Sequence, residues 1–329
     1  MYEYALIISQ SKIQHIIMKV AVIGVGYWGI KHVEEYLSLG HDIVICDKSE
    51  KNINICKDRF DTIQIKDLQE ILNDKEITCV SICTPNETHF EIASKCLESK
   101  KHVFLEKPIA TNLKDAEKLI EISENNNLIL QLGHLYRFNN SILKAKEIIN
   151  DKKLGNVHSV YFAWNNFEPV FNDRGIILDL GIHPVDIIHF IFGGDYEKIK
   201  CRGWGVRQNN PEFGVLNYKL VTSKKQIIFI NIELNWLNPI RKREMIIIGD
   251  TNTLKVQCVD QKISLINNTS QNIEEINVIS NNTIRDELEF FINSSEKNQS
   301  IPSPYPNANI GKSVLEIVLA AEIENFDKK

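Results

Sequence analysis

One segment near the start of the chain constrains its fold more than any other. Lys19–Gly24 (KVAVIG) is a β-branched apolar run, typical of a buried parallel strand. Trp28–Leu39 has apolar residues at helical spacing and stops before a glycine. Between them lies a G-x-G-x-x-G sequence, whose glycines permit a tight turn and close approach of a pyrophosphate to the helix amides. The three features together predict a dinucleotide site that includes Gly24, Gly26, Tyr27, Trp28 and Gly29.

The segments that follow alternate between short apolar runs and helical patterns. Strands are expected at 41–46, 78–83, 102–105 and 128–132, with helices at 68–72, 87–99 and 113–124. This alternation predicts an α/β fold with a doubly wound parallel sheet and right-handed crossovers. We therefore expect a Rossmann domain over residues 18–138, preceded by an extension of unknown role at 1–17.

After about residue 140 the pattern changes to strand-like runs joined by short polar turns. A helix is expected at 142–150, an apolar stretch at 176–192, and strands at 157–163, 199–206, 214–221, 226–235, 244–248 and 253–259. Turns this short favour antiparallel pairing. The sequence thus predicts an α+β substrate and oligomerisation domain with a large, mostly antiparallel sheet over 139–306. A C-terminal helix, 313–325, is expected within 307–329.

One face of this sheet is expected to lack enough helices to cover it. Ile228, Ile230 and Ile232 would then lie near water in a single subunit. We therefore predict a homodimer or homotetramer assembled through that face.

The composition excludes several classes of protein. The 329 residues exceed one average domain, and the formal net charge of −5 leaves no excess of lysine and arginine for a nucleic-acid surface. No apolar run approaches the roughly 18 residues of a transmembrane helix, and residues 1–17 lack the features of a secretory signal. The seven cysteines show no zinc-ligand spacing. They favour reduced thiols in a cytoplasmic protein with no metal site and no membrane partner.

The end of the second expected strand points to the identity of the dinucleotide. Asp47 follows Gly29 by 18 residues, where a carboxylate is expected to bind the ribose hydroxyls of the adenosine. The same carboxylate would repel a 2′-phosphate, which favours NAD. Lys48 and Ser49 follow directly and leave NADP possible.

Two later strand ends carry polar sequences. Thr84-Pro85-Asn86 follows the strand at 78–83, and Glu106-Lys107-Pro108 follows the strand at 102–105. Because the carboxyl ends of parallel strands face the ligand crevice, cofactor and substrate are expected to meet at these two sequences.

Five motifs occur in order along the chain and together resemble the Gfo/Idh/MocA oxidoreductase family. They are G-x-G-Y-W-G, T-P-N-x-x-H ending at His89, E-K-P, G-H-x-x-R-F-N at 133–139 and D-x-G-x-H-x-x-D at 179–186. The Gly-Tyr-Trp-Gly loop, the Arg137-Phe138-Asn139 run and the 173–179 segment are similar to the UDP-N-acetylglucosamine 3-dehydrogenase branch. Only Gly175 is present where the family often carries several glycines.

The resemblance implies roles for matching residues. Lys107, Asp179 and His183 would be catalytic, and Asp179 and His183 would also contact the substrate together with Tyr136 and Arg137. The cofactor would be bound by the glycine loop and by Asp47, Thr84, Pro85, Asn86, His89, Glu106 and Lys107. The resemblance implies NAD as the cofactor and a sugar or UDP-sugar as the substrate.

The residue types fit such chemistry independently. Oxidation of a hydroxyl requires a base, and histidine, here His183, is the natural residue for this role because its ordinary pKa is near neutral. An ammonium such as Lys107 stabilises the developing alkoxide. Asp179 is four residues before His183, a spacing that would place both on one helical face. Pro184, however, disfavours α geometry at His183 and indicates a helix boundary or kink there.

Some residues and functions remain open at this stage. Arg137 either touches substrate or forms a structural ion pair, His134 is unassigned, and His189 is expected to be structural. The leading function is NAD-dependent oxidation of a ring hydroxyl, with UDP-N-acetylglucosamine as the sharpest substrate candidate. The alternatives are an inositol or free-sugar dehydrogenase, an NAD-dependent glycoside hydrolase and a non-catalytic NAD-binding regulator. The regulator is disfavoured because it has no need of Lys107, Asp179 and His183.

Overall fold

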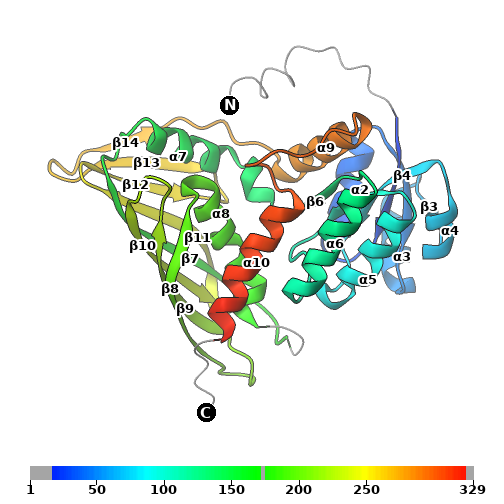
Figure 1. Ribbon diagram of the computed structural model, residues 1–329, viewed down its shortest axis with the longest axis horizontal. Coiled ribbons are helices and arrows are strands. Elements are labelled where there is room, and N and C mark those ends of the chain that lie inside the picture. Colours follow the sequence, from blue (N-terminus) through cyan, green and yellow to red (C-terminus); the bar gives the residue numbers. More distant parts are fainter. Residues whose placement is uncertain (1–16, 172–174, 324–329) are drawn as a thin grey trace.

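The computed structural model describes residues 17–171 and 175–323, which form two sheets side by side with helices between and around them (Figure 1). The extension predicted at 1–17 therefore lies outside the described residues except for its last residue. None of the described helices combines the length and apolar composition needed to cross a bilayer.

The first sheet has six parallel strands in the order β3-β2-β1-β4-β5-β6, which confirms the predicted doubly wound arrangement. Its strands are β1 Lys19–Ile23, β2 Asp42–Cys46, β3 Gln64–Ile65, β4 Ile77–Ile82, β5 His102–Leu105 and β6 Leu130–Leu132. Its helices are α2 Gly29–Ser38, α3 Glu50–Arg59, α4 Leu68–Asn73, α5 His89–Glu98 and α6 Leu113–Asn125, with 3₁₀ turns at Asn86–Thr88 and Leu135–Phe138.

Helix α3 and strand β3 were not predicted. Of the residues in α3 only Cys56 is buried, so the segment lacks the apolar stripe that reveals an amphipathic helix. The helix begins instead at a capping residue, because the Ser49 side chain accepts a hydrogen bond from the Asn52 amide.

The second sheet has eight strands in the order β14-β13-β12-β11-β7-β10-β9-β8. All neighbours are antiparallel except β7 and β10, so the predicted mostly antiparallel sheet is confirmed. Its strands are β7 Val157–Phe167, β8 Asp195–Trp204, β9 Phe213–Val221, β10 Ile227–Asn235, β11 Leu237–Gly249, β12 Asn252–Gln257, β13 Lys262–Asn267 and β14 Ile273–Ile276. The last two, which have six and four residues, were not predicted.

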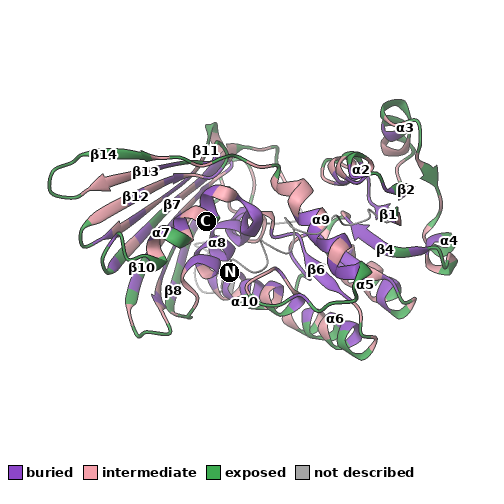
Figure 2. Ribbon diagram, turned by 90° about the horizontal axis from the view of Figure 1, so that it is seen from above, coloured by how far each residue is buried: buried purple, intermediate pink, exposed green. Residues whose placement is uncertain are grey.

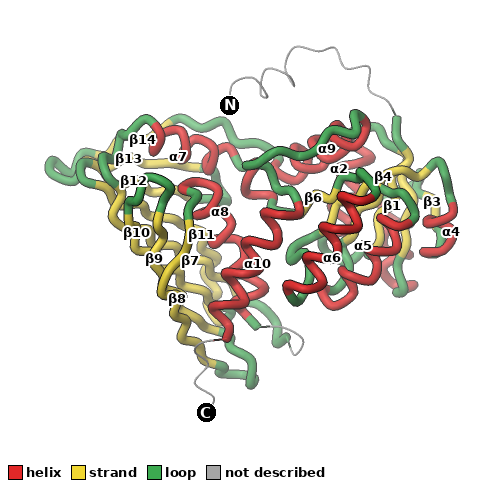
Figure 3. The backbone as a smooth tube through the Cα atoms, viewed as in Figure 1, coloured by secondary structure: helices red, strands yellow, loops and turns green. Residues whose placement is uncertain are grey.

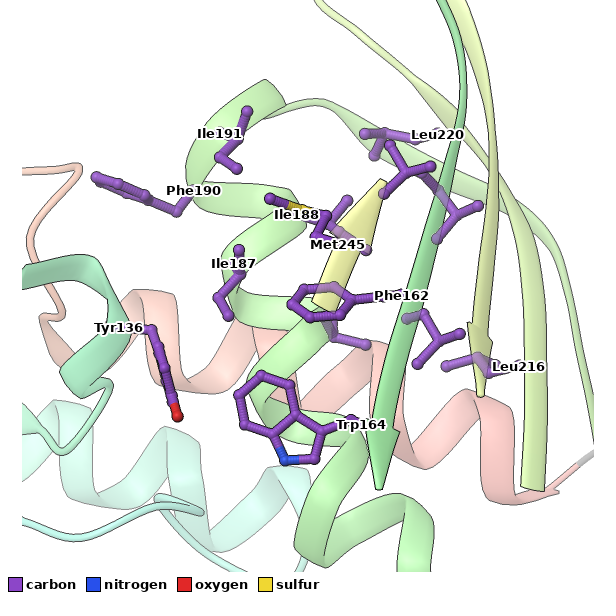
Figure 4. Packing of buried hydrophobic residues seen from close by; sticks show 14 of the residues in the cluster. Tyr136, Phe162, Trp164, Ile187, Ile188, Phe190, Ile191, Leu216, Leu220 and Met245 are labelled. Atoms are coloured by element: carbon purple, nitrogen blue, oxygen red, sulfur yellow. The ribbon is translucent and has the colours of Figure 1, made fainter. Parts of the chain in front are cut away.

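Helices α7 (Asn140–Asn150) and α8 (Ile182–Phe192) lie on one face of this sheet (Figures 1 and 3). Figure 4 shows Ile187 and Ile188 of α8 pointing toward Phe162 and Met245 of the sheet. A π-helical turn, Ile177–Gly181, leads directly into α8. His183 is therefore itself helical, which corrects the expectation from Pro184. The helix changes from π to α geometry just before Ile182. The wider π turn accommodates Pro184, which has no N–H to donate to the preceding turn.

Two helices at the end of the chain connect the two halves. Helix α10 (Ala308–Ile323) begins five residues before the predicted Ser313. It lies between the two sheets (Figure 2). Its Leu315 belongs to the core of the first sheet, and Val314, Ile317 and Val318 belong to the core of the second. Helix α9 (Thr283–Glu296), which was not predicted, places Leu288 and Phe291 in the core of the first sheet. A segment from the predicted second domain thus completes the packing of the first.

The outer face of the eight-stranded sheet carries different residues from those expected. Ile228, Ile230 and Ile232 are at most 2% exposed and belong to the core, so that part of the prediction was wrong. Side chains alternate along a strand, and the opposite face carries Ile227 and Phe229 of β10, which are 48% and 56% exposed. Tyr161 of the adjacent β7 is 48% exposed on the same face.

We propose that a second copy of the chain covers this outer face. Phe229→Asp places a charge on the face and should convert a dimer or tetramer into monomers, whereas Ile55→Asp, at an exposed position on α3, should not. Light scattering at micromolar concentration measures the mass directly. A monomeric mass for the unsubstituted protein would contradict the proposal.

Candidate active site

The three glycines of the nucleotide loop have separate structural roles. Gly24 has a φ of +85°, and a Cβ atom there would lie 2.8 Å from the carbonyl oxygen of Cys83 on the neighbouring strand. A Cβ atom on Gly29 would lie 1.9 Å from the carbonyl oxygen of Gly24. Gly26 has no atom within 4 Å of the corresponding position, so the space above it is open. This open space in front of the start of α2 fits a pyrophosphate.

The two aromatic residues of the loop lie at the start of α2. The rings of Tyr27 and Trp28 meet edge to face at 5.6 Å, and the Lys31 ammonium lies 4.2 Å from the centre of the Tyr27 ring. Tyr27 is an exposed side chain. Both residues directly follow Gly26 in the loop, and their contact with a cofactor stays a prediction.

Asp47 is fixed against the same loop. Its Oδ2 accepts a hydrogen bond from the Val25 amide at 2.7 Å, and its Oδ1 accepts one from the Ser49 amide at 2.7 Å. Asn52 donates a third at 3.2 Å. The carboxylate thus stands beside the pyrophosphate position at the end of β2, where a ribose diol would meet it.

His89 corrects one of the expected cofactor contacts. The ring is fully buried, with Nδ1 2.7 Å from the Pro108 carbonyl oxygen and Nε2 2.9 Å from the Thr84 carbonyl oxygen. Both nitrogens therefore face carbonyl oxygens of the protein, and a neutral ring donates a hydrogen bond to one of the two. His89 joins the Thr84-Pro85-Asn86 turn to the turn after Lys107, and so supports the cofactor-facing residues from behind.

Glu106 is likewise a buried residue, and its carboxylate contacts other residues of the protein. Its Oε1 lies 3.2 Å from Nε2 of His32 on α2, and its Oε2 accepts a hydrogen bond from the Lys107 amide at 3.3 Å. Nδ1 of His32 lies 2.8 Å from the Ser81 hydroxyl. Burial alone would raise the pKa of Glu106, but the His32 hydrogen bond and the charges of His32 and Lys107 bring it below its ordinary value.

Lys107 joins the two halves of the molecule at the carboxyl end of β5. Its Nζ donates a hydrogen bond of 2.9 Å to the Asp179 backbone carbonyl and lies 3.6 Å from Asp179 Oδ1. Asp179 belongs to the π-helical turn that leads into α8. The structure therefore brings two of the three predicted catalytic residues into contact, although they are 72 residues apart in the sequence.

His183 lies near this pair in an aromatic setting. Its ring stacks on Trp164 at 5.2 Å and meets the edge of Tyr136 at 5.7 Å. The imidazole makes no hydrogen bond within the described part of the chain, so the four-residue spacing does not bring it into hydrogen-bond contact with Asp179. Burial, followed by the charges of Lys107 and Arg243, holds the pKa of His183 well below its ordinary value. The ring is therefore neutral and able to accept a proton.

His134, His189 and Arg137 lie around the buried carboxylate of Asp186. Arg137 is buried and its Nη2 lies 2.7 Å from Asp186, which favours the structural ion pair over substrate contact. His134 Nδ1 lies 3.6 Å from the same carboxylate. Burial lowers the pKa of His134, and it lowers the pKa of His189 to about 4. In the described ranges, no three His, Cys, Asp or Glu side chains are arranged to hold a metal.

Two residues at the site were missed in the sequence. His32 lies three residues after the last glycine of the loop, on the helical face that packs against β4 and β5, and that position was its only signal. Arg243 donates to the Tyr136 hydroxyl at 3.1 Å. Its signal was the basic run Arg241-Lys242-Arg243 inside an otherwise apolar strand.

Comparisons with known proteins agree with this architecture. Residues 18–134 match the GFO_IDH_MocA oxidoreductase family with its NAD-binding Rossmann fold, and residues 142–255 match the GFO/IDH/MocA C-terminal domain. A myo-inositol 2-dehydrogenase from Thermotoga maritima is 30% identical over 194 residues, which are 56% of this chain and 58% of that protein. The chain thus spans less than two thirds of that relative's length.

Solved structures share the whole fold at lower identity. UDP-N-acetylglucosamine 3-dehydrogenase GnnA from Acidithiobacillus ferrooxidans has a TM-score of 0.79 at 20% identity, over 94% of this chain and 97% of that one. An oxidoreductase from Agrobacterium radiobacter in complex with NAD⁺, L-tartaric acid and magnesium has a TM-score of 0.80 at 17% identity, over 93% and 96%. The family match shows that residues 18–134 are an NAD-binding Rossmann domain. The open space above Gly26 and the neighbouring Asp47 carboxylate fit the binding of this cofactor.

The position of Asp47 predicts a preference between the two nicotinamide dinucleotides. Its carboxylate favours ribose hydroxyls and repels a 2′-phosphate, so NAD should bind more tightly than NADP. Asp47→Ala should reduce this difference in affinity between the two dinucleotides. Asp42→Ala, at an exposed position on the same strand, is the matched control. Calorimetric titration measures both affinities. A clear preference of the unsubstituted protein for NADP would overturn this assignment.

The buried pair of His32 and Glu106 predicts strong coupling between the two residues. His32→Leu leaves an ionised carboxylate buried without its partner and should lower the free energy of unfolding by about 3–5 kcal/mol. The double substitution His32→Leu/Glu106→Leu should cost less than the sum of the single substitutions. Urea denaturation of the four proteins completes the cycle. Additive losses would show that the two side chains are not coupled.

Proposed function

Because the chain belongs to the Gfo/Idh/MocA family of oxidoreductases, we propose that it oxidises a secondary ring hydroxyl of a sugar or sugar nucleotide with NAD. The observation that carries the proposal is the contact of Lys107 with Asp179 beside a neutral, buried histidine. This group lies at the carboxyl end of β5, next to the nucleotide loop, where a substrate would meet the cofactor.

The proposed roles follow from the chemistry of each side chain. The neutral His183 accepts the hydroxyl proton, and the Lys107 ammonium stabilises the negative charge that develops on the oxygen. Asp179 holds Lys107 in place through its carbonyl and its carboxylate. Bound NAD supplies the hydride acceptor. Burial of the imidazole keeps water from competing for its free nitrogen.

The substrate that we favour is UDP-N-acetylglucosamine, oxidised at C3. The likeness to GnnA over nearly the whole chain and the resemblance of the Gly-Tyr-Trp-Gly loop support this choice. The second candidate is an inositol, since the myo-inositol dehydrogenase of Thermotoga maritima is 30% identical over the aligned region. NAD-dependent glycoside hydrolysis begins with the same hydride step, and analysis of the products distinguishes it from simple oxidation.

We also propose a cytoplasmic location. All seven cysteines are free thiols, and five of them are buried. Burial raises the pKa of Cys79 to about 11 and that of Cys96 to about 12, so these thiols stay protonated and unreactive. Such thiols suit a reducing compartment.

Substitution of the three catalytic candidates tests the proposal. His183→Ala should lower kcat by about 10²–10⁴-fold with little change in NAD affinity, because it removes only proton transfer. Lys107→Ala should be comparably damaging and should also weaken cofactor binding. Asp179→Asn should be milder if Asp179 only positions Lys107.

The pH profile and a control complete this test. Because the pKa of His183 is lowered, the acid limb of the kcat/KM profile should have an apparent pKa below the ordinary histidine value of about 6.5. His189→Ala should affect stability more than turnover. Near-normal turnover in both His183→Ala and Lys107→Ala, on a substrate that the unsubstituted protein oxidises well, would show that the site is wrongly assigned.

A further inference from the structure

Arg243 of β11 lies beside the catalytic candidates although none of the motifs includes it. Its Nη1 donates to the Tyr136 hydroxyl at 3.1 Å, and its guanidinium carbon lies 4.8 Å from the centre of the Trp164 ring. The same Trp164 ring stacks on His183, and Tyr136 meets the edge of that imidazole. Arg243 and His183 therefore share both of their aromatic neighbours.

No carboxylate among the described residues lies within ion-pair distance of Arg243. Its Nε is buried and has no hydrogen-bond partner there. Arg59, Arg137 and Arg207, by contrast, each have an acidic partner: Glu34, Asp186 and Glu212. The adjacent Glu244 pairs with Lys242 and Lys255 instead. A half-buried guanidinium without a counter-ion is costly, and it attracts an anion.

The charge of Arg243 is felt at the reacting group. After burial and Lys107, it is the next cause that lowers the pKa of His183. The ammonium of Lys107 is balanced by the nearby Asp179 carboxylate, whereas no carboxylate of residues 17–171 or 175–323 lies within ion-pair distance of Arg243. An anionic group on the bound substrate would supply the missing charge and accept the free donors.

We propose that Arg243 binds a negatively charged group of the substrate, a phosphate or a carboxylate, and so selects anionic sugars over neutral polyols. This inference rests on the proposed function, because it places the anion on the molecule that is oxidised. The planar guanidinium, already held by Tyr136 and Trp164, presents its remaining N–H groups in the fork that both kinds of anion accept.

A purely structural role for Arg243 makes a different prediction. A guanidinium over an indole ring stabilises packing whatever the ligand is. Loss of Arg243 would then weaken the binding of neutral and anionic substrates alike, and added salt would not weaken the binding of anions more than that of neutral substrates. Substrate charge is therefore the variable that separates recognition of an anion from support of Trp164.

The test uses three probes with the NADH-loaded full-length protein: UDP-N-acetylglucosamine for a diphosphate, glucuronate for a carboxylate, and myo-inositol as the neutral control. Arg243→Gln should weaken calorimetric binding of the preferred anionic probe by about 10- to 100-fold and leave myo-inositol binding unchanged. Arg243→Lys, which keeps the charge, should recover part of the loss. Arg59→Gln removes an exposed arginine of the other half, and it should change neither the binding of the anionic probes nor the binding of myo-inositol.

Salt and turnover supply the remaining readouts. Binding of the preferred anion should weaken as ionic strength rises in the unsubstituted protein, and less so in Arg243→Gln. Equal weakening of all three probes in Arg243→Gln, or tighter binding of myo-inositol than of both anions, would overturn the inference. NADH formation from myo-inositol would then still support the proposed oxidation. Absence of NADH from all three probes contradicts the proposed function instead, while the binding comparison still decides the role of Arg243. Thermal melting and NAD affinity verify that each variant is folded.

Discussion

The hydrogen bond from Lys107 to the Asp179 carbonyl is the contact on which the functional account depends. It joins the end of a parallel strand, where a dinucleotide binds, to the π-helical turn that leads into α8 on the second sheet. In the proposed site, neither half holds all the catalytic candidates. The Rossmann half supplies the cradle and the ammonium, and the second half supplies the imidazole together with its aromatic and cationic neighbours.

The packing around that contact explains how two distant segments keep a fixed relation. Helix α10 contributes apolar side chains to the cores of both sheets, and α9 closes the first sheet from the far end of the sequence. Beneath the site, the pairs His32–Glu106 and Arg137–Asp186 satisfy buried charges. Buried groups of this kind hold strand ends in place because any displacement exposes an unpaired charge to an apolar interior.

Residue patterns sufficed where a single strong signal acted locally. The strand–glycine–helix sequence predicted the first sheet, and alternating runs predicted most of the second. Sequence patterns failed where local signals were weak, as in the polar α3. They also failed where the face of the sheet that a residue occupies depends on strand register, as for Ile228 and Phe229. The pairings of Glu106 with His32 and of Arg137 with Asp186 were not predictable, because they depend on which side chains meet after folding. Arg243 was missed for the same reason.

NADH formation by the unsubstituted protein tests the central claim most directly, since a regulator of the same fold binds NAD without reducing it. The protein is incubated with NAD and a panel of UDP-sugars, free sugars and inositols, and NADH absorbance is followed. The account predicts steady NADH production from at least one ring alcohol, lost in the double variant Lys107→Ala/His183→Ala. Tight NAD binding with no NADH from any member of the panel would contradict the account.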